Sequence, residues 1–205
     1  FTGSHGGRAA TVLASGAVLV VGGYTIGGKG SYAWPLAMLF DPVTASFSTT
    51  ASMNEARSGA TLTVLESADV LIVGGVSTSA EAIASVERYD VKASSFSLTG
   101  TMVSPRQGHS ASLLQDGAVL VAGGAPCLAD AANACEPHAS VELYDVTAGE
   151  FVEAPPMSSL RARHTATVLP SGNVLVVGGT NADWVSQTTA EIYDPTTTAG
   201  AGGGA

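Results

Sequence analysis

The chain has 205 residues, of which 45% are hydrophobic and 12% charged, so it can bury a sizeable core in one domain and is not disordered. Its formal net charge is −9 and its only lysines are Lys29 and Lys92, which excludes a basic surface for nucleic acid or an anionic membrane. No apolar run approaches the roughly 20 residues of a membrane-spanning helix, and no secretory leader is present, so we expect that any signal peptide has been removed.

The first predicted strands lie near the N-terminus. An apolar run ends in "TVL" at 11–13, the turn sequence "ASGA" follows, and a second run, "AVLVVGG", ends in Gly22 and Gly23. Two such runs around a short turn predict a β-hairpin. "LFDP" at 39–42 predicts a third strand ended by a type I turn, because an Asp side chain bonds backbone two residues on. Phe47 marks a fourth strand.

The same pattern returns three times along the chain. The glycine doublets are 52, 49 and 55 residues apart, and the later ones are Gly74-Gly75, Gly123-Gly124 and Gly178-Gly179. Third strands are predicted at "RYDV" (88–91), "LYDV" (143–146) and "IYDP" (192–195), and fourth strands at Phe96 and Phe151. In the last repeat Gly200 stands where a phenylalanine is due, and "AGAGGGA" is typical of a flexible tail.

Four short antiparallel strands per repeat, a period near fifty and a doublet after strand two resemble the kelch repeat. The resemblance covers almost the whole chain, although phenylalanine replaces the usual tryptophan of strand four. "RQGHSAS" (106–112) and "RARHTAT" (161–167) resemble secreted bacterial kelch proteins and the propeller of galactose oxidase-like proteins. The resemblance implies an all-β fold, a β-propeller of four-stranded antiparallel blades with four repeats in this chain.

We expect one propeller domain over residues 1–198, with blades at about 5–52, 53–101, 102–156 and 157–198, and a tail at 199–205. "FTGS" at 1–4 is similar to "LTGT" at 98–101, so residues 1–4 are candidates for the missing fourth strand of the last blade. That strand would join the two ends of the ring. Alternatively the four blades belong to a larger ring, completed by further sequence or by a second copy.

The glycine doublets are predicted to be structural. Residues without Cβ let the chain leave strand two in a conformation that costs other residues about 1 kcal/mol or more. "GGYTIGGKG" at 22–30 could be mistaken for a nucleotide-binding loop, but such a loop opens a helix, and here a strand follows every doublet.

The connections between strands two and three share one face with the links between blades, and they carry all the variation in length. Loops on a rigid scaffold are where binding sites usually lie. Aromatic rings there suit sugar stacking or protein contacts, although packing against the rim is the alternative. The candidate ligand-binding residues are Tyr24, Tyr32, Trp34, His138 and Trp184.

Charged residues recur at two matched positions in repeats two to four. Arginines open strand one and glutamates precede the aromatic of strand three by two residues, whereas the first repeat has His5 and Met38 instead. The arginine and the glutamate are both present in three repeats and both missing from the first. This joint occurrence predicts structural ion pairs rather than ligand contacts. The residues are Arg57, Arg106, Arg161, Glu87, Glu142 and Glu191.

Cys127 and Cys135 lie close together in a loop-like segment, and a disulfide is expected. On the chain-entropy model so small a loop contributes about 2–3 kcal/mol, and the bond persists only in an oxidising compartment, which favours export. Two free thiols are the alternative.

No catalytic set stands out. In galactose oxidase-like enzymes a histidine matching His109 or His164 is a copper ligand preceded by a tyrosine, but Gly108 and Arg163 precede them here, which disfavours copper. The turn aspartates supply one carboxylate per blade, too few for calcium. We expect no metal and no cofactor, and an enzyme is not favoured.

The sequence therefore predicts an extracellular or cell-surface module that recognises protein or carbohydrate through the face carrying the 2–3 loops. The alternatives are a structural subunit of a surface assembly or filament and, third, a galactose oxidase-like copper oxidase. Neither nucleic acid nor membrane insertion is expected, and self-association stays open.

Overall fold

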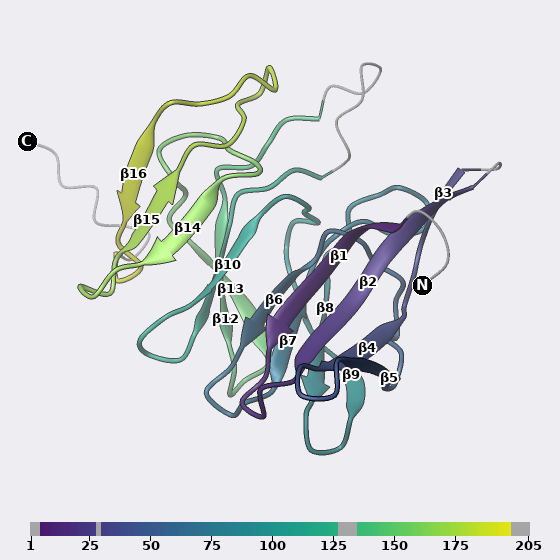
Figure 1. Ribbon diagram of the computed structural model, residues 1–205. Helices are drawn as coiled ribbons and strands as arrows, with labels where there is room; N and C mark the ends of the chain where they lie inside the picture. The colour runs from purple at the N-terminus through teal and green to yellow at the C-terminus, as the bar shows by residue number, and fades with distance from the viewer. Residues whose placement is uncertain (1–4, 28–29, 127–134, 198–205) are drawn as a thin grey trace, which may run out of the picture.

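The fold is all-β, as expected from the repeats. The computed structural model describes residues 5–27, 30–126 and 135–197, which contain strands and turns but no helix. Four antiparallel sheets form the blades of a β-propeller and follow one another along part of a ring (Figure 1). The described residues accordingly include no helix that could cross a membrane.

The strands follow one another in each blade in chain order. Blade 1 contains β1 (His5–Val12), β2 (Val18–Gly27), β4 (Ala37–Asp41) and β5 (Ser46–Thr49), with β3 (Gly30–Ala33) paired to β2. Blade 2 contains β6 (Thr61–Val64), β7 (Val70–Val73), β8 (Ser85–Asp90) and β9 (Ser95–Thr101). Blade 3 contains β10 (Ser110–Leu113), β11 (Val119–Ala122), β12 (Val141–Asp145) and β13 (Glu150–Ala154).

Blade 4 has three strands in the described part of the chain: β14 (Thr165–Val168), β15 (Val174–Val177) and β16 (Ala190–Tyr193). The proposed closing strand at 1–4 and the tail at 199–205 lie outside the described residues. The strand that completes blade 4 therefore stays a prediction.

The first doublet departs from the expected pattern. In blade 1 the second strand continues through Gly22 and Gly23 to Gly27, because β3 supplies a partner beyond the doublet, with Tyr24 opposite Ala33. Both glycines still have positive φ, at 64° and 100°. The doublet therefore bends the strand without always ending it, and in blade 1 the bent strand continues into a hairpin with β3.

The turn aspartates act on the backbone as their sequence context indicates. The Val43 N–H donates to Asp41 Oδ1 at 2.8 Å and the Thr147 N–H to Asp145 Oδ1 at 2.7 Å, two residues on in both cases. Asp90 instead accepts from Ala93, three residues on. Hydrogen bonding of this kind explains aspartate at these positions without a metal ion.

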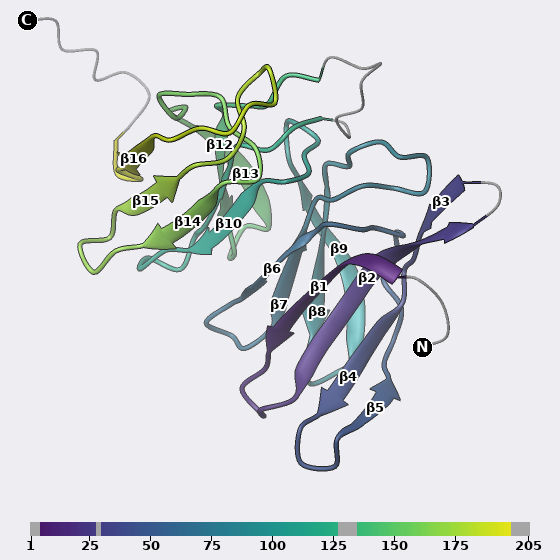
Figure 2. The ribbon, with the colours of Figure 1, turned by 45° about the horizontal axis from the view of Figure 1, so that its top comes forward.

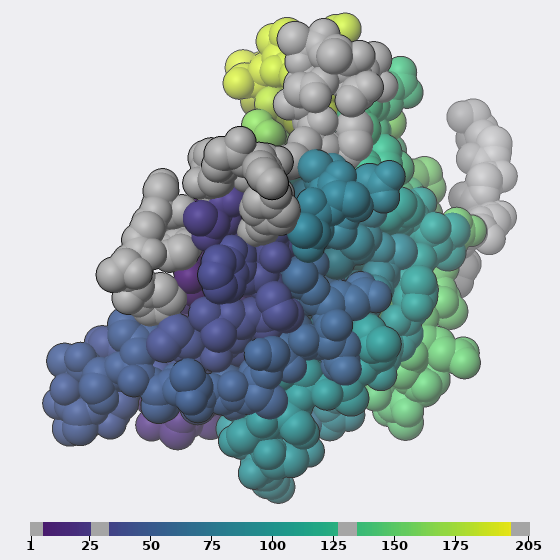
Figure 3. Space-filling view, turned by 90° about the vertical axis from the view of Figure 1, so that its right-hand side faces the viewer, coloured from purple at the N-terminus to yellow at the C-terminus, as the bar shows by residue number. Residues whose placement is uncertain are grey.

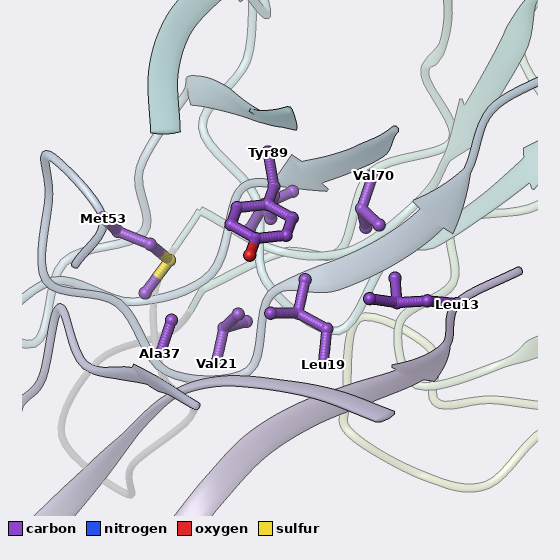
Figure 4. Close-up of a cluster of buried hydrophobic side chains, with 8 residues drawn as sticks. Leu13, Leu19, Val21, Ala37, Met53, Val70 and Tyr89 are labelled. Atoms are coloured by element: carbon purple, nitrogen blue, oxygen red, sulfur yellow. The ribbon is translucent and has the colours of Figure 1, made fainter. Parts of the chain in front are cut away.

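The core lies between neighbouring blades. Leu19 and Val21 of blade 1 pack against Val70 and Tyr89 of blade 2 (Figure 4), and equivalent clusters join blade 2 to blade 3 and blade 3 to blade 4. Figure 3 shows the first two blades side by side. Figures 1 and 2 show the first strands, β1, β6, β10 and β14, following one another in chain order.

Candidate functional site

The propeller has two opposite faces, one with long connections of variable length and one with short turns. The loop face comprises the 2–3 connections (24–36, 76–84, 125–140 and 180–189) and the links between blades (50–60, 102–109 and 155–164), apart from the gaps at 28–29 and 127–134. The 1–2 and 3–4 turns form the turn face. In Figure 1 the 2–3 connections project toward the upper side and the turns toward the lower side.

Buried ion pairs hold the base of the loop face in blades 2 to 4. The guanidinium of Arg106 is fully buried and lies 2.5 Å from the carboxylate of Glu142, which is 1% exposed. It also donates to the carbonyls of Gly123 and Ser140, at 2.7 and 3.1 Å. Glu142 in turn accepts from the backbone N–H of Val103 at 2.8 Å. The pair thus ties the link before the blade to strands two and three of the same blade.

The other two pairs repeat this arrangement. Arg57 and Glu87 lie 3.1 Å apart with both side chains fully buried, and Arg161 and Glu191 lie 3.1 Å apart. Burial lowers the pKa of Arg57 and Arg106, and the facing glutamates raise it in part. The arginines bond mainly backbone and buried side chains of their own blade, and Arg57 also lies 3.6 Å from the half-exposed carboxylate of Glu55. These contacts favour the structural role that the sequence predicts.

The same arginines join neighbouring blades through their carbonyls, a contact that sequence reasoning missed. The N–H of the second glycine in each doublet donates to the arginine of the next blade: Gly23 to Arg57, Gly75 to Arg106 and Gly124 to Arg161, at 3.0, 3.0 and 2.9 Å. A Cβ on Gly74 would lie 2.6 Å from the carbonyl oxygen of Arg106. The doublets are therefore sites of close approach between blades.

His109 and His164 also bridge blades. Nε2 of His109 lies 2.9 Å from the Thr61 hydroxyl of the preceding blade, and Nε2 of His164 lies 2.9 Å from the Ser110 hydroxyl. Burial, followed by the nearby arginine, lowers the pKa of His109 to about 3 and that of His164 to about 4. Both rings are neutral at physiological pH and act as hydrogen-bonding spacers between strands.

This burial predicts a stability loss in mild acid. Because each folded pKa is depressed, the unfolded chain binds more protons than the folded chain below about pH 6.5, and each histidine costs about 1.4 kcal/mol per pH unit until its folded pKa is reached. Between about pH 6.5 and 5 we expect a loss of about 2 kcal/mol per histidine, measured by urea unfolding.

The matched control for this experiment is His109→Ala, since Ala60 stands at the same position in blade 2. The variant should show a weaker pH dependence in this window, and what remains comes from His164 and from His138, whose pKa burial also lowers. Carboxylates whose pKa is lowered, such as Asp41 and Asp69, act at lower pH and do not interfere. A flat stability profile between about pH 6.5 and 5 in the parent chain would contradict buried neutral histidines.

The aromatic candidates lie in blades 1 and 4 and differ in exposure. Trp34 is 40% exposed. Trp184 is half-buried, with φ at 58°, and the guanidinium of Arg163 lies 5.4 Å from its ring centre, which is packing within blade 4. The half-buried ring of Tyr24 covers Gly6, whose added Cβ would lie 2.8 Å from that ring.

The remaining two candidates contribute less. His138 is half-buried, and burial and then Arg106 lower its pKa. Its backbone N–H donates to Gly124 at 2.6 Å, which ties the connection of blade 3 to the doublet. The side chain of Tyr32 lies outside the described part of the structure. Of the five candidates, Trp34 is therefore the one whose exposure best suits ligand stacking.

Blade 2 adds a hollow that sequence reasoning did not find. It measures about 510 Å³ and is lined by Glu55, Ala56, Ser77, Ser79, Glu81 and Ile83 among others. The Arg57 N–H donates to the Trp34 carbonyl at 3.3 Å, so the backbone of Trp34 runs beside the segment that carries Glu55. Two carboxylates and several hydroxyls thus gather next to the blade that carries the exposed tryptophan.

The turn face has a hollow of about 580 Å³ between blades 2 and 3, lined in part by Glu66, Asp116 and Asp145. Asp145 and Asp116 already accept backbone hydrogen bonds from their own turns. No group of three or more metal-binding side chains occurs within the described ranges. This hollow carries no recognisable chemistry of its own.

The predicted disulfide falls partly outside the described residues. Cys135 is 7% exposed, whereas Cys127 lies in the gap at 127–134. The bond between them stays a prediction.

Comparison with family models and with curated proteins adds no relative. No family model matches the chain, and no curated protein matches it.

Proposed function

We propose that the chain is an exported, kelch-like binding module that takes a carbohydrate ligand on its loop face, with a protein ligand as the alternative. The observation that carries this proposal is the 40% exposure of Trp34. Its backbone carbonyl accepts from the N–H of Arg57, two residues after Glu55 of the polar hollow in blade 2. An aromatic ring stacks on the apolar face of a sugar, while carboxylates and hydroxyls accept and donate hydrogen bonds to its hydroxyl groups.

The scaffold supports such a role. Arg57 and Glu87 fix both ends of the segment that borders the hollow, because Glu87 accepts from the N–H groups of Asn54 and Glu55 at 2.8 and 3.0 Å. A rigid base under variable loops is the usual design of a binding surface. The kelch-like repeat and the predicted disulfide are the grounds for proposing export.

A glycan array tests the proposal directly. We expect binding to a subset of glycans, and we expect Trp34→Ala to weaken it by about 5- to 30-fold, since stacking on one ring is worth about 1–2 kcal/mol. Val43→Ala is the matched control, because Val43 is 91% exposed on the turn face. Binding of a protein but of no glycan would favour the alternative, and equal binding by the Trp34→Ala chain would exclude this site.

A further inference from the structure

The two outer blades each leave one face of their sheet uncovered. All four residues of β7 are 0% exposed, and those of β11 are at most 1% exposed, because blades 2 and 3 have a neighbour on both sides. In blade 4, Val174 and Val176 are fully buried, yet Val177 is 43% exposed. In blade 1, Val12 is 63% exposed.

The uncovered face of blade 4 has the composition of a blade-packing face. The register places Ile192, which is 63% exposed, opposite Leu175, so both lie on the same side as Val177. The matching residues of blade 3 are the ones that pack on blade 4. They are Leu120, Ala122 and Leu143.

The uncovered face of blade 1 corresponds to the face that each later blade packs against the blade before it. Val12, Val18 and Phe40 lie opposite one another in the register, with Val20 on the same side. The matching residues of blade 2 are the ones that receive blade 1. They are Val64, Val70, Tyr89 and Ile72.

The backbone of the glycine doublet in blade 4 also lacks the contact that the earlier doublets make with the next blade. The second glycine of every earlier doublet donates its N–H to the next blade, whereas the N–H of Gly179 has no acceptor among the described residues. An added Cβ on Gly178 would meet only the Gln187 oxygen, at an ordinary contact distance of 3.7 Å. In the earlier doublets the same Cβ would lie 2.2 to 2.6 Å from an arginine carbonyl oxygen of the next blade. Blade 4 is thus shaped to receive a further blade.

We propose that a second copy of this chain covers both faces, with blade 1 of each copy on blade 4 of the other, so that two copies form one eight-bladed ring. The same two faces are used twice, so the arrangement closes by two-fold symmetry, and eight blades lie within the range of known propellers. His5 occupies the position of Arg57, Arg106 and Arg161, so the carbonyl of His5 in the second copy is the acceptor for the Gly179 N–H. This assembly does not depend on the proposed ligand.

The mass in solution tests the proposal. We expect sedimentation of the 205-residue chain to show a dimer. Val177→Asp combined with Ile192→Asp should raise its dissociation constant by about 100-fold or more, as should Val12→Asp combined with Val20→Asp. Val43→Asp is the control, because Val43 is 91% exposed in a turn away from both faces. Circular dichroism checks that each variant keeps its strands.

Mixing separates this ring from other dimers. An equimolar mixture of the blade 4 variant and the blade 1 variant retains one unmodified pair of faces, so it should form a mixed dimer although each variant alone is monomeric. A parent chain that stays monomeric at about 100 μM, growth beyond two copies, or two variants that fail to complement would overturn the proposal.

Discussion

Replacing Arg106 by methionine is expected to lower the free energy of unfolding by about 3–5 kcal/mol. The substitution leaves the carboxylate of Glu142, which is 1% exposed, without its cation, and an uncompensated buried charge costs this much. It also removes the donors to the carbonyls of Gly123 and Ser140. Chemical denaturation at neutral pH measures the change.

The double variant Arg106→Met with Glu142→Met distinguishes a coupled pair from two separate contributions. We expect it to lose no more stability than Arg106→Met alone, because blade 1 packs without either charge, having His5 and Met38 at these positions. The less buried pair of Arg88 and Asp69 is the comparison: their side chains are 38% and 11% exposed, so Arg88→Met should cost less than Arg106→Met. Strictly additive losses at Arg106 and Glu142 would contradict the coupling.

The fold could be predicted from the sequence because each repeat carries its own local signals. The distance from the end of strand one to the doublet is constant, the aspartates mark the turns, and the phenylalanines mark strand four, whose rings pack on strand three, as Phe96 does on Tyr89 at 4.7 Å between ring centres. Internal repetition also indicated which charged residues vary together. The structure then placed each arginine beside the glutamate of its own blade.

The site was less predictable, because it depends on contacts between segments far apart in the sequence. The hollow combines the link at Glu55 with the connection at Ser77 and Glu81. Trp34 and Trp184 both lie in 2–3 connections, yet Trp34 is 40% exposed whereas Trp184 is half-buried under Arg163, and the folded loop alone decides this difference. Gly22 and Gly23 likewise gave no sign that β3 would extend the second strand.

Gly74→Ala is expected to destabilise the chain by about 2–5 kcal/mol. The residue has φ at 58°, which costs alanine about 1–2 kcal/mol. Its new Cβ would also lie 2.6 Å from the carbonyl oxygen of Arg106 and 2.9 Å from the ring of His109, and overpacking of this kind adds about 1–3 kcal/mol. The N–H of Gly75 donates to the same carbonyl of Arg106. Displacing this carbonyl therefore also weakens the hydrogen bond between blades 2 and 3.

Gly178→Ala separates the two contributions to that loss. Gly178 stands at the same place in blade 4 and has φ at 67°, but its added Cβ would be 3.7 Å from any neighbour, so only the backbone term of about 1–2 kcal/mol remains in the monomer. Thermal or urea unfolding of both variants, at a concentration where the chain is monomeric, gives the difference. Equal losses would show that the left-handed conformation alone requires glycine, and that close approach of the next blade does not.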